Sequence, residues 1–316
     1  MGKHCEQRLI SLGWVCALIL ALAVPAYAVD GVIEINQARA LAGGVTLGDT
    51  TPGFPVTISQ PGSYRLTGNL TVPNENTTAI QITAENVTID LNGFAILGPT
   101  VCTYTGVGAI PVTCMPAGTG RGIDGTAAGL AVLNGTVRGM GAAGIFFQGG
   151  SRAEGVHVVS NGSSGIGGNY GSSNLITHNI AELNGEAGIQ AGGGATVSQN
   201  VAAYNGIRGI DAGGGECTII GNTATLNGSE GIYSNNLSTI TNNTTVANKG
   251  DGIFTGGGSL VQGNQSSANG GRGLAFSFGG GAAGYTHNVF ASNTGGSVGG
   301  GAPVSLGQNL CNGVVC

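Results

Sequence analysis

The sequence predicts an all-β fold, a right-handed parallel β-helix (a solenoid) of roughly ten coils with an N-terminal capping helix. The first observation is a repeat of about 21 residues in the second half of the chain, because a fixed period of this length is typical of solenoids. The second is the presence of 63 Gly among 316 residues. A Gly inside a helix costs about 1 kcal/mol relative to Ala, so this composition argues against helical repeats. The third is the short runs of Ile, Val and Thr, which favour strands.

The repeat unit has two Asn columns and a Gly-apolar pair at a fixed spacing. The apolar residue falls at Ile123, Ile145, Ile166, Ile189, Ile210, Ile232, Ile253 and Leu274. One Asn column stands five residues before the later members, at Asn161, Asn184, Asn205, Asn227, Asn248 and Asn269, and the other five residues earlier again, at Asn179, Asn200, Asn222, Asn243 and Asn264. Coils about 4.8 Å apart would let these amides hydrogen-bond along the axis. We therefore interpret both columns as structural, and we expect the Asn-Gly pairs to supply the positive φ of the turns.

The chain is expected to begin with a cleaved secretory signal over residues 1–28. Lys3 and Arg8 form a basic start, an apolar run covers 9–24, and Ala26-Tyr27-Ala28 is a small-x-small cleavage site. The apolar run is shorter than the ~20 residues that span a bilayer, so the mature chain is expected to have no transmembrane segment.

The mature chain then divides into three parts. Residues 29–62 are predicted to form the N-terminal cap, with a short helix at 36–42 that Asn36 can cap. Residues 63–306 are predicted to form the β-helix, and residues 307–316 a C-terminal tail. A cap is expected because an open strand edge invites pairing with other chains.

Five Cys follow the signal segment. Cys102 and Cys114 bracket an insertion at about 99–120 that interrupts the period, so we expect a disulfide at the neck of this insertion. Cys311 and Cys316 are expected to close the tail in the same way. Cys217 lies in a strand-like segment and is interpreted as a buried, inert thiol.

Charged residues are rare and mostly acidic. Residues 1–28 hold two of the 10 basic and one of the 15 acidic residues, which leaves 8 and 14 and a net charge of −6. A basic patch of the kind that binds nucleic acid is not found in this sequence.

Several segments resemble secreted bacterial right-handed β-helix repeat proteins of the pectin-lyase-like superfamily. The similar segments are 62–70 (Gly-Ser-Tyr-Arg-Leu-Thr-Gly-Asn-Leu), 87–93 (Val-Thr-Ile-Asp-Leu-Asn-Gly) and the Gly-Ile and Asn-Gly repeats to about Asn293. The resemblance covers nearly all of the mature chain and implies the fold. Because the superfamily includes lyases, hydrolases, epimerases, adhesins and accessory proteins, it does not imply one activity. The chain lacks the Trp-Ile-Asp-His segment found in pectate lyases.

Outward residues of the predicted strands include a polar-then-aromatic strip. With a β period of two, the residue after each inward Ile faces outward, and this column contains Gln190, Asp211, Tyr233 and Phe254. Aromatic rings can stack on sugars while the carboxylate and amide bond to hydroxyl groups, so the strip is a candidate glycan-binding site. The alternative is a sheet face that binds no ligand.

A second column, two residues before each Ile, offers candidate catalytic groups. Glu230 and Asp251 occupy neighbouring coils, with Lys249 and Arg272 close by. One hypothesis is a carboxylate pair for glycoside hydrolysis or for Ca²⁺, with Lys249 and Arg272 as base and acid in β-elimination from a uronate. The favoured alternative is a ladder of ion pairs, Arg208 with Glu230 and Asp251 with Arg272, worth about 0–1 kcal/mol each on a surface. No metal-ligand spacing of His is found.

The function that these observations favour is that of a secreted or periplasmic noncatalytic protein that binds a polysaccharide or envelope glycan, or serves a structural role there. The alternative is a polysaccharide-acting enzyme, that is, a lyase, a glycoside hydrolase or a uronate epimerase. Self-assembly through the Gly-rich columns is a third hypothesis. The identity of the glycan and the oligomeric state stay open.

Overall fold

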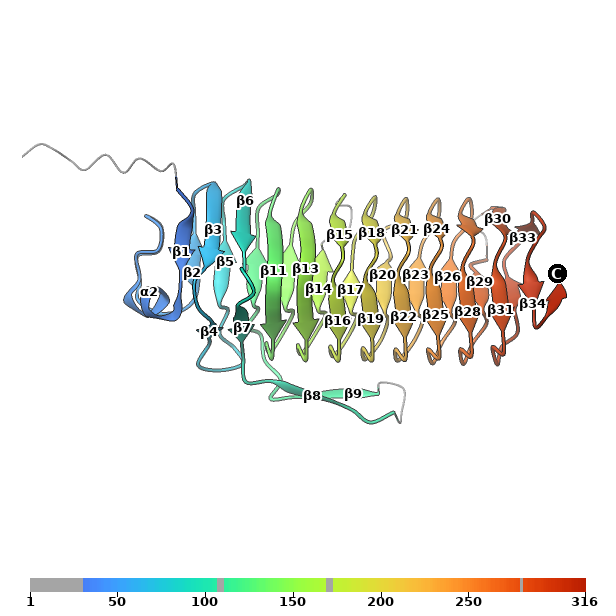
Figure 1. The fold of residues 1–316 in the computed structure, drawn as a ribbon, viewed down its shortest axis with the longest axis horizontal. Coiled ribbons are helices and arrows are strands. Elements are labelled where there is room, and N and C mark those ends of the chain that lie inside the picture. Colours follow the sequence, from blue (N-terminus) through green and yellow to red (C-terminus); the bar gives the residue numbers. More distant parts are fainter. Residues whose placement is uncertain (1–30, 107–110, 169–172, 279–280) are drawn as a thin grey trace, which may run out of the picture. The chain divides into compact units, whose positions relative to one another are not determined.

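The computed structural model describes residues 31–106, 111–168, 173–278 and 281–316, and residues 33–316 form one compact unit. The predicted signal segment lies outside the described residues. Within the unit, the chain winds into coils that stack in sequence order, and neighbouring coils pair in parallel (Figure 1). The predicted parallel β-helix is therefore confirmed, with eleven coils in the described residues where roughly ten were expected.

Each coil gives one strand to an 11-stranded sheet. Its strands are β2 (Val56–Ile58), β5 (Ile80–Ile82), β10 (Ile123–Gly125), β12 (Ile145–Phe147), β14 (Ile166–Gly168), β17 (Ile189–Gln190), β20 (Ile210–Ala212), β23 (Ile232–Ser234), β26 (Ile253–Thr255), β29 (Leu274–Phe276) and β32 (Val298–Gly300). The apolar residue of the Gly-apolar pair is the first residue of each strand from β10 to β29. All eight apolar residues of this column are 0% exposed, so they form one wall of the core.

The rest of each coil contributes to a 22-stranded sheet, as one long strand in β11 and β13 and as two short strands in most other coils. Its strands are β1 (Ile33–Ile35), β3 (Gly62–Leu66), β4 (Leu70–Thr71), β6 (Val87–Asp90), β7 (Ala95–Leu97), β11 (Ala131–Arg138), β13 (Arg152–Val159), β15 (Leu175–Thr177), β16 (Ile180–Glu182), β18 (Thr196–Ser198), β19 (Val201–Ala203), β21 (Thr218–Ile220), β22 (Thr223–Thr225), β24 (Thr239–Thr241), β25 (Thr244–Val246), β27 (Leu260–Gln262), β28 (Gln265–Ser267), β30 (Ala283–Thr286), β31 (Val289–Ala291), β33 (Pro303–Ser305), β34 (Leu310–Cys311) and β35 (Val314–Val315).

Helix α2 (Gln37–Ala42) forms where the sequence predicts it. The Asn36 side chain accepts a hydrogen bond from the Arg39 N–H at 3.0 Å, and Ala40 is fully buried in the core. The segment assigned to the cap also supplies β1 and β2 to the two sheets. A role of α2 in covering the open end of the solenoid stays a prediction. Among the described residues, no helix is long and apolar enough to cross a bilayer.

The Asn columns form two continuous hydrogen-bonded ladders, as predicted. In the first, each Nδ2 donates to the Oδ1 of the next coil at 3.0 Å, through Asn179, Asn200, Asn222, Asn243, Asn264, Asn288 and Asn309. In the second, the same contact measures 2.9–3.0 Å, through Asn161, Asn184, Asn205, Asn227, Asn248, Asn269 and Asn293. Nearly all members are at most 1% exposed, so the ladders are internal scaffold.

The prediction that the Asn-Gly pairs supply positive φ holds at Asn92-Gly93 and Asn312-Gly313 but is wrong for the pairs in the ladder. The left-handed conformation falls on the residue before each ladder Asn, as at Leu183 (φ 53°) and Tyr204 (φ 55°). Gly185, after Asn184, has another role, since a Cβ on Gly185 would collide with the carbonyl oxygen of Gly162 in the preceding coil. The Gly before the inward Ile also leaves no room for a side chain, since a Cβ on Gly188 would lie 2.6 Å from Asn205 Nδ2.

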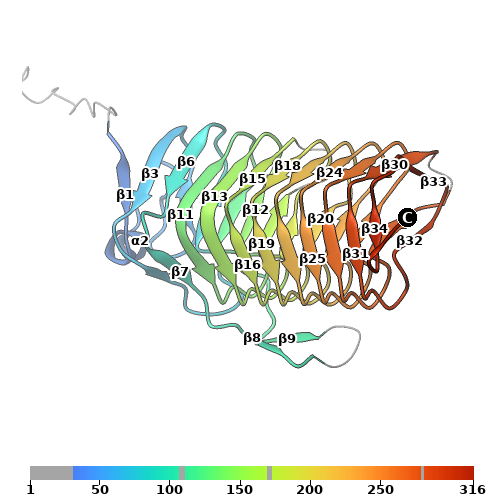
Figure 2. The same ribbon diagram turned by 45° about the vertical axis from the view of Figure 1, so that its right-hand side comes forward.

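The insertion is a hairpin of β8 (Val101–Tyr104) and β9 (Val112–Met115), closed by the predicted Cys102–Cys114 disulfide. It lies beside one corner of the coils in both views (Figure 1, Figure 2), and the Tyr104 and Tyr204 rings meet edge-on at 5.2 Å. The Cys311–Cys316 disulfide also forms. Cys217 is a free, buried thiol, as predicted.

Candidate functional site

The four residues of the predicted strip lie side by side on the 11-stranded sheet. The strands β17, β20, β23 and β26 pair in register, so that Gln190 faces Asp211, Asp211 faces Tyr233, and Tyr233 faces Phe254. The Tyr233 and Phe254 rings stack with centroids 5.3 Å apart and planes 6° apart. The Tyr233 hydroxyl donates to Asn235 Oδ1 at 3.1 Å. The strip therefore presents two stacked rings next to polar groups.

Arg208 organises the polar end of this strip. Its Nη1 donates to Asp211 Oδ2 at 2.8 Å, and its Nε donates to Glu230 Oε2 at 2.9 Å. The guanidinium also lies 3.7 Å from the centroid of the Tyr233 ring, a cation–π contact. One arginine thus fixes two carboxylates and one ring, which come from two neighbouring coils. The sequence pattern assigns Arg208 to an ion-pair ladder and not to the binding site. The sequence feature that indicates its role in the site is the spacing of three residues between Arg208 and Asp211.

Asp211 is more enclosed than an outward column position suggests. The residue is only 9% exposed, because Arg208 covers one carboxylate oxygen and the Gly213 N–H donates to the other at 3.0 Å. The exposed surface of the strip is therefore supplied mainly by Gln190 and the two rings.

The carboxylates of the neighbouring column have pKa values shifted in opposite directions. Burial alone would raise the pKa of Glu230, but hydrogen bonds from Arg208, from a backbone N–H and from Ser229, with the charge of Arg208, hold this pKa below its usual range. Burial raises the pKa of Asp251 and the charge of Glu230 adds to the rise, although the Arg272 N–H and the Arg272 charge oppose it. Despite its burial, the pKa of Arg208 is raised by the same two carboxylates that it contacts, Glu230 and Asp211.

The predicted ion-pair ladder forms in one of its two places. Arg208 pairs with Glu230 as expected. Asp251 instead accepts the backbone N–H of Arg272 at 2.5 Å, and within the described residues these two side chains make no ion pair. The exposed Arg272 side chain extends over Gly299 in the next coil. Lys249 follows Asn248 at the corner, where its backbone N–H donates to the carbonyl of Asn227 at 3.0 Å.

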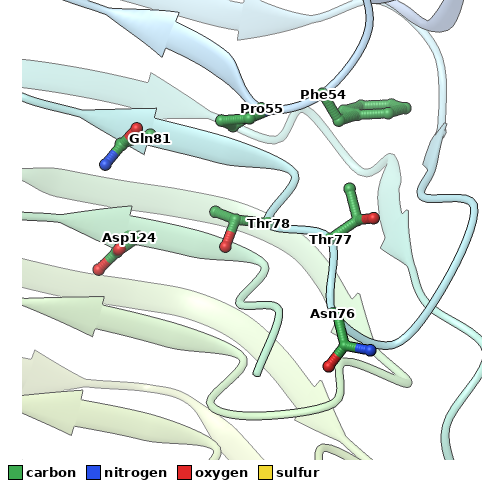
Figure 3. A pocket seen from close by; sticks show the side chains of 7 residues that line it. All are labelled: Phe54, Pro55, Asn76, Thr77, Thr78, Gln81 and Asp124. Atoms are coloured by element: carbon green, nitrogen blue, oxygen red, sulfur yellow. The ribbon is translucent and has the colours of Figure 1, made fainter. Parts of the chain in front are cut away.

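A second polar cluster, which the sequence reasoning missed, lies at the other end of the same sheet. Arg121 Nη1 donates to Asp124 Oδ1 at 2.7 Å, and its guanidinium lies 4.2 Å from the centroid of the Phe146 ring. Asp124 borders a pocket of about 310 Å³ lined by Phe54, Pro55, Asn76, Thr77, Thr78, Gln81 and Asp124 (Figure 3). The signal in the sequence was the tetrapeptide Arg-Gly-Ile-Asp, which occurs at 121–124 and again at 208–211.

Metal ligands do not gather in the part of the chain that the structure describes, where no three His, Cys, Asp or Glu side chains form a group able to hold an ion. A Ca²⁺ ion between Glu230 and Asp251 stays an untested prediction.

Comparisons with known proteins establish the fold. A family model for the right-handed β-helix region matches residues 121–266. The chain is similar to the crystal structure of the periplasmic alginate epimerase AlgG, with 14% identity over 86% of this chain and 83% of that chain and a TM-score of 0.55. It is also similar to pectate lyase Pel9A, with 18% identity over 88% and 78% and a TM-score of 0.52. No curated protein matches the sequence. At these identities the likeness concerns the fold alone.

Proposed function

Starting from a right-handed parallel β-helix of the pectin-lyase-like fold, we propose that this protein is a noncatalytic glycan-binding protein that acts outside the cytoplasm. The outward face of the 11-stranded sheet, from Gln190 to Phe254, is the proposed binding surface. The two solved structures named above are those of an alginate epimerase and a pectate lyase, and a polysaccharide ligand here is consistent with them.

The observation that carries this proposal is the preformed contact set around Arg208. A sugar ring offers an apolar face and a rim of hydroxyl groups. The Tyr233 ring lies between Arg208 and Phe254, so the apolar partner for that face is the Phe254 ring, whose neighbour in the next coil is the small Ala275. Arg208 and Asp211 are already held by a 2.8 Å contact beside the rings. Since these side chains lose little further freedom on binding, the ligand does not have to order them.

The same contacts argue against a general-acid role for Glu230. A general acid must carry a proton near neutral pH, whereas the Arg208 guanidinium keeps Glu230 ionised. Its Oε2 also accepts from Arg208 and from the Ser229 hydroxyl, so that oxygen is already occupied.

Three observations support a location outside the cytoplasm. The first 28 residues have the pattern of a cleaved export signal. The Cys102–Cys114 and Cys311–Cys316 disulfides are typical of oxidising compartments. The alginate epimerase of similar fold is a periplasmic protein. Cleavage at Ala28 is tested by N-terminal sequencing of the protein recovered from the envelope or medium.

Binding is tested with a panel of immobilised neutral and acidic polysaccharides. Retention by at least one of them is expected, and Tyr233→Ala is expected to weaken it at least tenfold because the ring that supports Phe254 and contacts Arg208 is lost. Phe278→Ala is the matched control, since Phe278 is an aromatic residue outside the strip and is 85% exposed. Failure of every polysaccharide to retain the protein, or equal losses in the two variants, contradicts the proposal.

A second candidate function is polysaccharide cleavage, and one observation favours it. Glu230 and Asp251 occupy neighbouring coils and their pKa values move apart, which is the arrangement that assigns one base and one acid to a carboxylate pair. This hypothesis predicts turnover of a uronate polysaccharide or a neutral glycan, measured as unsaturated products or new reducing ends with and without Ca²⁺. Asp251→Asn, Lys249→Ala or Arg272→Ala should abolish that turnover, and product formation that persists in all three contradicts this assignment.

A further inference from the structure

The face of the 11-stranded sheet contains the same side-chain arrangement twice. In the first module, Arg121 bonds to Asp124 at 2.7 Å and lies 4.2 Å from the Phe146 ring centroid. In the second module, Arg208 bonds to Asp211 at 2.8 Å and lies 3.7 Å from the Tyr233 ring centroid. In both modules the Arg stands two residues before the inward Ile, the Asp one residue after it, and the ring one coil further on.

The two modules have the same orientation and a fixed separation. Asp124 and Asp211 belong to β10 and β20, which are joined in register through β12, β14 and β17. These are four coil steps of about 4.8 Å, so the modules lie about 19 Å apart. An extended sugar chain advances about one unit per coil step, and one such chain can therefore reach both modules with a span of about five sugars.

Small side chains line the surface between the two modules. In the column of the two arginines, the intervening residues are Ala143, Ser164 and Ala187, which are 7%, 3% and 7% exposed. In the outward column, Gly167 separates Phe146 from Gln190. The buried Ser164 hydroxyl has no hydrogen-bond partner among the described residues. Bulky side chains thus stand at the two ends of the interval, and small ones lie along most of it.

The charge of this face disfavours an acidic ligand. Each module contains one Arg and one Asp, so its net charge is zero, and Glu230 adds a negative charge beside the second module at 2.9 Å from Arg208. The chain after residue 28 has 8 basic and 14 acidic residues. Each Arg keeps N–H donors beyond those bound to carboxylates, and these suit hydroxyl groups better than a carboxylate that Asp211 and Glu230 would repel.

We propose that the two modules are paired subsites for a single linear, uncharged glycan of about five or more sugar units. This inference rests on the proposed glycan-binding function and adds the length and the charge class of the ligand. Each module packs one sugar against the outward edge of its ring and bonds to the hydroxyl groups of that sugar through the Arg N–H donors that the carboxylates leave unused. Once one module is occupied, the second binds the same chain at a high effective concentration, which increases affinity by about 100-fold or more.

The test measures binding of neutral gluco-, xylo-, galacto- and manno-oligosaccharides, from disaccharide to octasaccharide, by isothermal titration calorimetry. A disaccharide of the matching series is expected to bind weakly with two sites per chain. A hexasaccharide is expected to bind about 100-fold more tightly with one site per chain. Oligogalacturonides of equal length are expected to bind at least tenfold more weakly than the neutral series.

Variants separate the two modules. Phe146→Ala or Tyr233→Ala should each reduce hexasaccharide affinity to about that of the disaccharide and leave one disaccharide site, and the double variant should bind neither. Arg121→Lys and Arg208→Lys, which keep the charge but lose the planar fork, should act in the same direction. The matched control is Arg152→Ala, because Arg152 forms an Arg–carboxylate pair with Glu154 on the other sheet. Circular dichroism establishes that each variant is folded.

The outcomes also separate this inference from the proposed function. Glycan binding that shows no length dependence, a single disaccharide site in the unmodified protein, or a preference for oligogalacturonides overturns the paired-subsite inference and leaves glycan binding intact. Absence of binding to any glycan overturns both.

Discussion

Replacing one ladder asparagine at mid-solenoid should cost far more stability than replacing one at the end. Asn205 is fully buried; its Nδ2 donates to the Ala181 carbonyl and to Asn227 Oδ1, both at 3.0 Å. Its Oδ1 accepts the backbone N–H of Asn184 at 3.1 Å and the Asn184 Nδ2 at 3.0 Å. Asn205→Ala therefore leaves two buried donors on Asn184 without acceptors. At about 1–3 kcal/mol for each such group, we expect a loss of about 2–6 kcal/mol in the free energy of unfolding.

The matched variant is Asn293→Ala in the same ladder. Asn293 Oδ1 accepts the same two bonds from Asn269, at 3.0 and 2.9 Å, but the residue is only half-buried, so water can satisfy the orphaned donors. We expect a cost of about 1 kcal/mol, the net value of an ordinary hydrogen bond. Urea unfolding followed by circular dichroism measures both, and native-state hydrogen exchange reports the Asn184 amide directly. Equal costs in the two variants, or undiminished protection of the Asn184 amide in Asn205→Ala, would refute the reasoning.

Three further predictions concern the scaffold and its titrating groups. Gly188→Ala should destabilise by about 3 kcal/mol, because the new Cβ would lie 2.6 Å from a ladder amide. The control Gly150→Ala should cost only about 1–2 kcal/mol, because Gly150 has a φ of +67° but no atom near the new Cβ. Equal urea midpoints for the two variants would contradict this prediction. The pKa of Glu230 is lowered in the folded protein, so this residue stabilises the fold at pH values above its unfolded pKa. The pKa of Asp251 is raised in the folded protein, so its stabilising contribution is lost as the pH rises through that folded-state pKa. Between about pH 3 and pH 7, Glu230→Gln should therefore become progressively destabilising and Asp251→Asn progressively stabilising, and the same sign in both melting series would exclude this assignment. Burial raises the pKa of the Cys217 thiol, so iodoacetamide should label Cys217 only after unfolding, and labelling of the native protein would show that the coil opens there.

Most of the scaffold could be predicted from the sequence because each coil must satisfy the same packing requirements, so the same residue types recur at the same positions. The inward Ile column, both Asn ladders and the two disulfides were located from spacing alone, and all of them form. The turns that precede the ladder Asn residues do not follow residue propensity. Propensity places positive φ on Asn and Gly, yet Leu183 and Tyr204 adopt it, at φ 53° and 55°. The buried hydrogen bonds of the following Asn outweigh the roughly 1–2 kcal/mol that a left-handed residue costs.

For the candidate site, the strand period predicts the columns but not the contacts between them. The positions of Gln190, Asp211, Tyr233 and Phe254 follow from this period, and their pairing is confirmed. Whether a long side chain crosses to the coil before or after its own depends on side-chain direction, which a one-dimensional pattern does not contain. Arg208 therefore reaches Glu230 as expected, but Arg272 turns toward Gly299 instead of pairing with Asp251.

The sequence by itself determined the solenoid, its period, its inward face and the low charge of its surface, because these depend on composition and on spacings within one coil. The tertiary structure alone decided that Arg208, beyond its expected contact with Glu230, also holds Asp211 and Tyr233, and that Arg121, Asp124 and Phe146 repeat this arrangement. The physical reason is that stacking brings residues about 21 positions apart to within about 5 Å. The chemistry of the face is then set by the choice of side-chain partners among those neighbours.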